Sequence, residues 1–193
     1  MRQSPADIDH AILDVAAGVF ATHGFAHSSV QQIADAVGYS KPGLLHRFGS
    51  KEALHRAVLQ EVSETVQDII GHALAHADTA DQVPQVLQLI TRKALDRPGM
   101  VQMMLAAFQP DCQEPGIEAI QAAGYRLVDA LDHPASRPAE RLRVVLALDL
   151  IVTAAITQHS RVDADLHVDR DELVPMLVSL AAQVMGAGHD VRA

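Results

Sequence analysis

At 193 residues, with 49% hydrophobic but only 3% aromatic side chains, the chain can bury a sizeable core but has too few aromatic residues for a typical sheet protein. A single cysteine, Cys112, excludes an internal disulfide framework and fits a reducing cytosol. The formal net charge of −9 argues at first against a nucleic-acid partner.

Three helices are predicted in the first fifty residues. The first ends at residues 23–24, where His is followed by Gly. The second begins after the capping residue Ser29 and ends at Gly38, where glycine permits a positive φ. Ser40 caps the third. We expect these helices to form an N-terminal domain, residues 1–50.

The third helix, predicted to end at Phe48, carries Pro42 and Gly43 in its first turn. Proline costs little there, because the first N–H groups of a helix have no intrahelical acceptor. Glycine lets another surface approach the backbone. A short helix, a tight turn and then this helix have the layout of a helix-turn-helix, whose second helix enters the major groove of double-stranded DNA.

Longer helices are predicted in the rest of the chain. One begins at Ser50, and the others lie near 81–96, 100–108, 115–132, 137–161 and 170–185. We expect them to form a second domain, residues 51–193. The predicted fold class is therefore all-α, a three-helix helix-turn-helix unit followed by an antiparallel helical bundle, with about nine helices.

The charge is distributed unevenly along these helices. Residues 1–60 carry as many acidic as basic side chains, so the whole excess of −9 lies in residues 61–193. Between residues 38 and 56 basic side chains outnumber acidic ones, and two histidines are added. A small basic patch therefore coincides with the predicted helix-turn-helix, as expected of a DNA-binding surface.

The N-terminal sequence resembles the TetR-type transcriptional regulators over residues 8–58. The matching positions are Ile12-Leu13, Ala16-Ala17, Phe20, Gly24-Phe25, Ser29-Val30, Ile33-Ala34, Val37-Gly38, Ser40-Lys41, Leu44, Phe48 and Ser50-Lys51-Glu52-Ala53-Leu54. The resemblance implies a homodimeric DNA-binding regulator. It also implies an all-helical fold with three DNA-binding helices, a ligand-binding bundle, and a dimer formed mainly by the last two long helices.

The resemblance also implies which residues contact DNA. The family usually has Gly-Thr-Leu-Tyr where this chain has residues 42–45, so two hydroxyl groups that often touch the DNA backbone are missing. We expect phosphate contacts instead from Ser29, Ser40, Lys41, His46 and Lys51. We expect base readout from Lys41, Gly43 and Arg47, and the alternative that Arg47 is only a solvated surface charge stays open. The predicted DNA-binding residues are Ser29, Ser40, Lys41, Pro42, Gly43, His46, Arg47 and Lys51.

A dimer interface is predicted on the last two long helices. Residues 142–156 are apolar on nearly every side, so this helix must be buried all round, partly against a second copy. Two copies are needed because two recognition helices must reach half-sites about one DNA turn apart. The predicted interface residues are Leu148, Val152, Ala155, Leu177, Leu180 and Val184.

A cluster of methionines indicates an adaptable apolar pocket for a small-molecule effector. Its predicted members are Met100, Met103, Met104, Phe108, Tyr125 and Asp149. Each methionine could equally be core packing. Tyr125 and Asp149 are polar groups in apolar settings that need a partner, and Asp149 in a pocket would favour a cationic effector.

Two other classes of function remain open from the sequence. A metal- or redox-responsive regulator could use His72 and His76, spaced i and i+4, the acidic stretch Asp163, Asp165, His167 and Asp169, or Cys112. Solvated surface is the competing interpretation of these groups, and we predict neither a metal nor a cofactor. A helical-bundle enzyme would have to use Asp149, Tyr125 and His159, but no nucleophile–base spacing supports it.

No part of the sequence predicts a membrane partner. The N-terminal stretch MRQSPADIDH is polar and acidic, so we do not expect a secretory signal. The longest apolar run, residues 144–156, is interrupted by Asp149 and is too short to span a bilayer. We therefore expect a cytoplasmic protein. Its operator, effector and regulated genes, and whether it represses or activates, are not encoded in any pattern we recognise.

Overall fold

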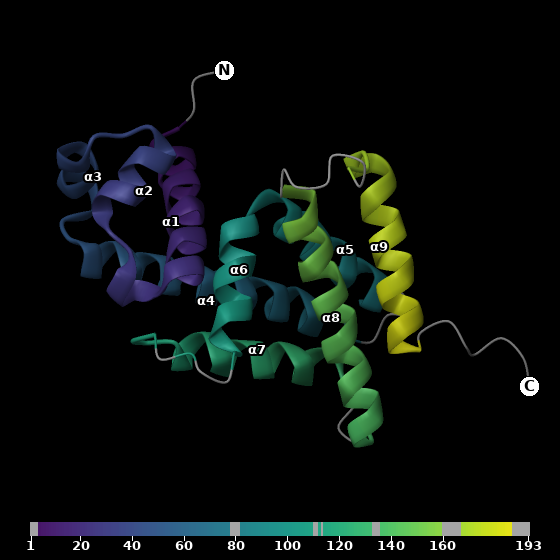
Figure 1. Ribbon diagram of the computed structural model, residues 1–193. Helices are drawn as coiled ribbons and strands as arrows, with labels where there is room; N and C mark the ends of the chain where they lie inside the picture. Colours follow the sequence, from purple (N-terminus) through teal and green to yellow (C-terminus); the bar gives the residue numbers. More distant parts are fainter. Residues whose placement is uncertain are drawn as a thin grey trace, which may run out of the picture. The chain divides into compact units, whose positions relative to one another are not determined.

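The computed structural model describes residues 4–77, 82–109, 112, 114–132, 136–159 and 167–186, and over these residues it contains helices and no strand. In chain order (Figure 1) the helices are α1 (Pro5–His27), α2 (Val30–Val37), α3 (Lys41–Phe48), α4 (Lys51–Ala75), α5 (Gln82–Asp96), α6 (Pro98–Ala107), α7 (Glu118–Leu131), α8 (Pro138–His159) and α9 (Arg170–Met185). The all-α prediction is confirmed.

Contacts between Cα atoms divide the chain into two compact units. The first unit runs to Glu64 and also contains Arg97–Ala122. The second unit contains Thr65–Asp96 and the chain from Ala123 onward. The first unit therefore extends beyond residue 50, where the sequence places the domain boundary, because α6 packs against α1 and belongs to the same core.

The core of the first unit joins α1, α2, α3, α6 and the first part of α4. Its buried members include Ile12, Phe20, Ile33, Leu44, Leu54, Val58, Met100 and Met103. Helices α1 and α6 lie side by side (Figure 1) and come unusually close at Gly99. A Cβ atom added at Gly99 would lie only 1.9 Å from the backbone oxygen of Asp14. Glycine is therefore required for this packing.

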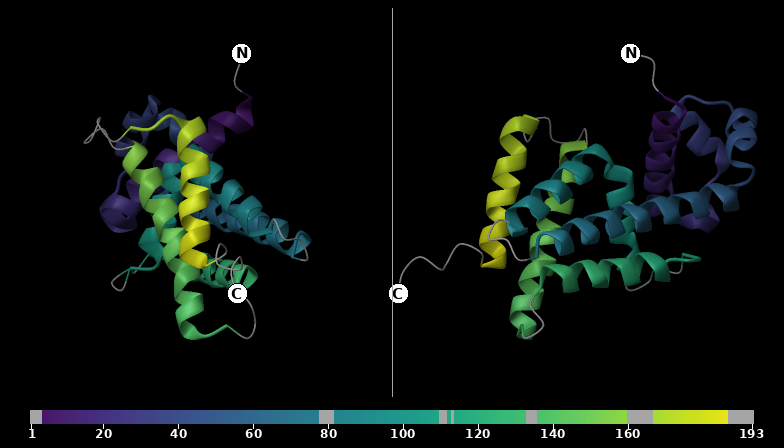
Figure 2. Two further views of the ribbon diagram at one scale, coloured as in Figure 1. Left: turned by 90° about the vertical axis from the view of Figure 1, so that its right-hand side faces the viewer. Right: turned by 180° about the vertical axis from the view of Figure 1, so that it is seen from behind.

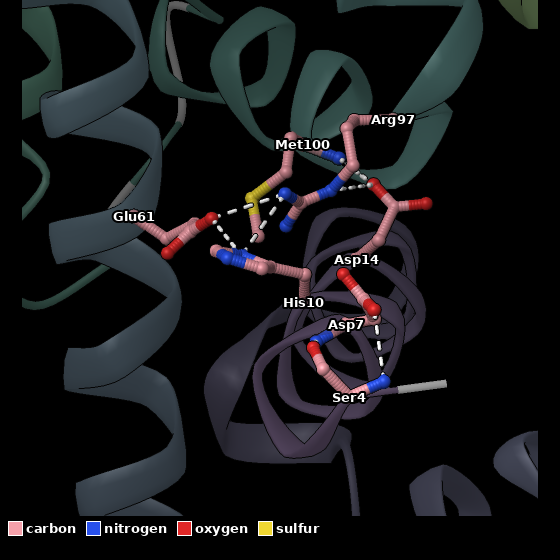
Figure 3. Close-up of polar contacts among 7 residues, drawn as sticks. All are labelled: Ser4, Asp7, His10, Asp14, Glu61, Arg97 and Met100. Carbon is pink, nitrogen blue, oxygen red and sulfur yellow. Dashed lines mark hydrogen bonds and ion pairs between the residues drawn. The ribbon is translucent and has the colours of Figure 1, made fainter. Parts of the chain in front are cut away.

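A polar cluster holds the start of α6 against α1 and α4 (Figure 3). The carboxylate of Asp14 accepts the N–H of Met100 at 2.9 Å, in the first turn of α6. Arg97, just before α6, donates to Glu61 at 3.0 Å, and the ring of His10 lies 2.6 Å from the same carboxylate oxygen. Ionic contacts thus fix the angle at which the three helices meet in the first unit.

The second unit is built on α5, α8 and α9, with α8 and α9 side by side (Figure 2). Each helix gives a buried apolar face: Val86, Leu87 and Ile90 from α5, Val144, Ile151 and Val152 from α8, and Leu173, Val174 and Leu177 from α9. No helix among the described residues is long and apolar enough to cross a membrane.

Candidate nucleic-acid interface

The helix-turn-helix of the first unit is built by local signals that the sequence predicts. Ser29 and Gln32 form a capping box, in which each backbone N–H donates to the other's side chain, at 2.8 and 3.1 Å. Gly38 ends α2 in the left-handed conformation, with φ 71°. The N–H of Tyr39 then donates to Ala34 at 2.8 Å, which closes the turn before α3. Both predicted helix boundaries are confirmed.

The start of α3 presents a slim, exposed surface. Ser40 accepts the N–H of Gly43 at 3.2 Å, and Lys41 and Pro42 are exposed. A Cβ atom at Gly43 would lie 3.1 Å from the hydroxyl oxygen of Ser40, so glycine leaves room for the cap. Leu44 points the other way and is fully buried in the core. The weak first turn is therefore anchored from behind and open to an approaching surface.

Arg47 is not a free charge on this surface. Its guanidinium pairs with the carboxylate of Asp9 in α1 and donates to the backbone oxygen of Pro5 at 2.8 Å. The hydrogen bond that Arg47 donates to Asp9 raises the pKa of Arg47. The sequence leaves base readout and solvated charge open for Arg47, and the structure places it in a third role, tying α3 to the start of α1. Lys41 and His46 are exposed on the same helix.

Lys51, predicted to bind phosphate, also contacts its own chain. Its ammonium group donates to the backbone oxygen of Phe25 and lies 4.3 Å from the centre of the Phe25 ring. Ser50 caps α4 by accepting the N–H of Ala53 at 3.1 Å. The positive charge of Lys51 thus lies at the end of α1, where it donates to a backbone carbonyl oxygen and covers an aromatic face.

Two residues beside Lys51 were not predicted from the sequence. His55 is only 4% exposed and lies between the rings of Phe20 and Phe25, each 4.8 Å away. Its Nε2 atom is 3.2 Å from Glu114, which also accepts the N–H of Phe25 at 2.7 Å. Burial lowers the pKa of His55, and Glu114 opposes that shift. The signal available in the sequence was a histidine on the apolar side of the fourth helix.

The first unit matches a known family of DNA-binding proteins. Residues 12–58 fit the family model described as bacterial regulatory proteins, tetR family. The match to the TetR family thus covers the N-terminal helices of the chain. RutR, an HTH-type transcriptional regulator of Escherichia coli K12, is 46% identical over 52 residues, which are 27% of this chain and 24% of RutR.

A second curated relative is a repressor. AcnR, an HTH-type transcriptional repressor of Corynebacterium glutamicum, is 30% identical over 67 residues, which are 35% of this chain and 36% of AcnR. The chain therefore matches between a quarter and about a third of the length of RutR and AcnR. These relatives are transcriptional regulators, which counts against the enzyme hypothesis.

Solved structures of TetR-family proteins share the fold over nearly the whole chain. A TetR-like transcriptional regulator from Rhodococcus sp. RHA1 has a TM-score of 0.58 at 19% identity, covering 96% of this chain and 99% of that one. A TetR-family regulator from Marinobacter aquaeolei VT8 has a TM-score of 0.58 at 20% identity, covering 93% of this chain and 96% of that one. At such low identity these likenesses show the fold alone.

The residues predicted for an effector pocket are divided between the two units of the chain. Met100 and Met103 are buried in the core of the first unit, and Met104 packs against that core. Phe108 and Tyr125 are exposed, Tyr125 by 60%. Met103 has no exposed surface, because it fills space in the core shared with α1 to α4. For Met100 and Met103 the structure therefore gives the core-packing alternative.

Asp149 lies instead in a surface groove between α8 and α9. Leu146, Leu150, Thr153 and Met176 are among the residues that line this groove. Asp149 is exposed at the rim of the groove, yet apolar neighbours displace water from its carboxyl group and raise the pKa of that group. Asp149 is therefore on the outer face of α8.

Most residues predicted for the dimer interface point inward. Leu148, Val152, Ala155 and Leu177 are buried within a single copy of the chain, Val184 is half-buried, and Leu180 is exposed. A helix that is apolar on every side has no hydrophobic periodicity from which its outer face can be predicted. The residues that we predicted for the interface therefore lie mostly on its inner face. The exposed apolar side chains of the α8–α9 surface are Leu142, Val145, Leu146, Met176 and Leu180.

The structure describes only some of the groups named for a metal or redox sensor. Among the described residues, no three His, Cys, Asp or Glu side chains come together as metal ligands. His76 is hydrogen-bonded to the backbone oxygen of His72 at 2.8 Å. Asp163 and Asp165 lie outside the described residues, while His167 and Asp169 are exposed. Cys112 is a half-buried thiol packed at the edge of the first-unit core.

Proposed function

We propose that the protein is a homodimeric transcriptional repressor that binds a palindromic DNA operator and is released by a small apolar effector. The observation that carries the proposal is the first turn of α3, which is capped by Ser40, exposed at Lys41 and Pro42, and anchored from behind by Leu44. This is how the second helix of a helix-turn-helix meets the major groove.

The proposed contacts lie at helix N-termini. Ser29 and Ser40 are the capping residues of α2 and α3, and hydroxyl groups at such positions contact phosphates without reading sequence. Lys41 supplies charge at the same end of α3, and His46 lies one turn further on. Lys51 and Arg47 bind their own chain. We therefore propose that they hold the DNA-contacting groups in place and do not themselves contact bases.

The proposed second copy binds through the α8–α9 surface. Its apolar side chains are exposed by 37 to 56%, more than a monomeric protein needs to leave in contact with water on two adjacent helices. The same surface on two copies can pair around a two-fold axis, because an isologous interface is complementary to itself. A dimer of this kind brings two α3 helices to two half-sites of one operator.

The proposed effector site stays near Met104 and Phe108, in the last turns of α6. Met104 is half-buried and Phe108 is exposed, so a small apolar molecule can cover both without opening the buried core around Met103. A Met104→Trp variant is expected to mimic the ligand and weaken operator binding while the dimer persists. A folded Met104→Trp dimer with normal operator affinity would place the effector elsewhere.

The proposal is tested by selecting a duplex from a random-sequence pool with the purified protein. A selected palindrome that binds at least a thousandfold more tightly than a scrambled duplex supports it, since specific and non-specific affinities typically differ by about that much or more. Lys41→Ala is expected to weaken binding and to lower the slope of log affinity against log salt by about one unit.

Lys93→Ala, a lysine of α5 in the second unit, is the matched control and should leave the slope unchanged. If the protein selects no sequence, or if Lys41→Ala binds the duplex as the wild type does, the α3 surface is not a DNA interface.

A further inference from the structure

The backbone of Phe25, four residues before the cap of α2, is hydrogen-bonded on both its N–H and its carbonyl oxygen. Its N–H donates to the carboxylate of Glu114 at 2.7 Å. Its carbonyl oxygen accepts from Lys51 and, at 3.0 Å, from the hydroxyl of Ser28. We call Phe25, Lys51, His55 and Glu114 the Phe25 cluster. Both sides of one residue are thus held by side chains from two other parts of the chain.

The geometry of α1 explains why Phe25 needs these partners. Gly24 leaves the helical conformation, with φ 73° and ψ 159°, so α1 is kinked there. The N–H of Phe25, which follows this kink, donates to Glu114. The four residues from Phe25 to Ser28 lead directly into the cap of α2. The carboxylate of Glu114, by accepting the N–H of Phe25, therefore sets where the helix-turn-helix begins.

Glu114 reaches this position from a segment outside the DNA-binding helices. It lies between α6 and α7, and a Cβ atom on Gly24 would come within 3.1 Å of its carboxylate. Its second oxygen faces the buried ring of His55 at 3.2 Å, so the carboxylate is enclosed by α4 and by the end of α1. A carboxylate held this way is costly to leave without its donor.

We propose that Glu114 is a positioning residue of the DNA interface, which couples the segment between α6 and α7 to operator affinity through the N–H of Phe25. This inference rests on the proposed function. When Glu114 holds Phe25, the entry into α2 is fixed, and with it the orientation of α2 and α3. If Glu114 withdraws its carboxylate, the N–H of Phe25 loses its acceptor and that orientation is released.

The kind of substitution that weakens binding separates this role from simple electrostatics. DNA phosphates repel a carboxylate, so removing the charge of Glu114 should leave DNA binding unchanged or strengthen it if charge is all that matters. A positioning role predicts weaker binding wherever the hydrogen bond to Phe25 is lost, even if the charge is kept, because the hydrogen bond and not the charge holds Phe25 in place. Two conservative variants separate the charge from the hydrogen bond.

Glu114→Gln keeps an oxygen at the same reach and loses the charge, and we expect its affinity for the selected duplex to stay within about threefold of wild type. Glu114→Asp keeps the charge but withdraws the oxygens by one methylene, and we expect about tenfold weaker binding, as for a lost hydrogen bond to a charged group. Both variants retain a polar group opposite His55, so both are expected to fold.

The readout is the ratio of affinities for the selected and the scrambled duplex, measured per folded protein by stoichiometric titration. A structural role alone would lower the melting temperature and the active fraction without changing that ratio. Glu118→Gln and Glu118→Asp, at an exposed position in the first turn of α7, are the controls and should leave the ratio unchanged.

The inference is overturned if Glu114→Asp binds as tightly as Glu114→Gln, or if neither differs from wild type. It is supported if Glu114→Asp alone has a lower ratio of selected-duplex affinity to scrambled-duplex affinity than the wild type. These outcomes are distinct from failure of the proposed function, in which the wild-type protein itself would select no duplex.

Discussion

The two units of the chain differ in the kind of side chain at their surfaces and in what those side chains contact. In the first unit long polar side chains bind the unit's own backbone and helices: Arg47 holds α1, Lys51 holds Phe25, and Arg97 joins α4 at Glu61. In the second unit the adjacent helices α8 and α9 leave large apolar side chains in water, among them Leu146 at 49% and Leu180 at 42%.

This difference separates orientation from association. Directional polar contacts fix the angles between helices, which a DNA-reading surface requires. Exposed apolar area has no direction, but it favours burial against another surface. The contacts of the first unit therefore hold a geometry, and the exposed apolar surface of the second unit is the one that we propose binds a second copy. The predictions below test this contrast, from the largest expected effect to the smallest.

Gly99→Ala should break the first unit. The added methyl group meets the backbone of Asp14, which cannot move aside as a side chain would. We expect a loss of about 3 kcal/mol or more in the free energy of unfolding, at or above the upper end of overpacking effects. Urea denaturation followed by circular dichroism measures it.

Gly71→Ala is the matched control, since a Cβ atom at this exposed position of α4 meets nothing within 4 Å. It should raise stability by roughly 0.5–1 kcal/mol through helix propensity. Equal stabilities for the two variants would show that α1 and α6 do not pack as closely as described.

Leu146→Glu should separate the two copies. A charge in the centre of an apolar interface loses its hydration without gaining a partner, and we expect the dimer dissociation constant to rise on the order of a hundredfold. Sedimentation velocity over a concentration series measures the effect. Leu74→Glu, on α4 and 61% exposed, is the control and should leave the dimer intact. A dimer that survives Leu146→Glu would move the interface away from α8.

His55 should make the first unit sensitive to acid. Burial lowers the pKa of His55 in the folded protein below its ordinary value of 6.5, so the unfolded chain binds the proton more readily. The stabilisation is fully present above about pH 6.5 and is lost as pH falls through the folded pKa. Unfolding free energies between pH 7.5 and 5 should show this decline, and His55→Phe should flatten it.

His23→Gln, at an exposed position of α1, is the control for that series. A decline of the same size in His55→Phe as in wild type would assign the acid sensitivity to other groups.

Asp149→Asn should have the smallest effect. Apolar neighbours raise the pKa of Asp149 above its ordinary value of 3.8, so its contribution to stability is present below that value and is lost as pH rises through the folded pKa. At pH 7 the ionised carboxylate therefore opposes burial of the α8–α9 surface. We expect Asp149→Asn to tighten the dimer modestly at pH 7 and to leave it unchanged near pH 3. A weaker dimer at pH 7 would mean that a partner group binds the carboxylate.

The sequence alone determined the elements of the first unit. Ser29, Gly38 and Ser40 specify caps and turns through groups only a few positions apart, so the helix-turn-helix and its exposed first turn follow from local chemistry. The helix ranges in the second unit were likewise close to those observed, because proline and polar segments separate long apolar runs.

The tertiary structure decided the partners of the charged residues and the outward face of α8. Glu114 meets Phe25 from 89 positions away, and Arg47 meets Asp9 from 38, distances at which no local pattern specifies a contact. In α8, apolar residues occur at nearly every position, so periodicity carries no phase and only packing against α5 and α9 determines that Ala155 is buried while Leu146 is exposed.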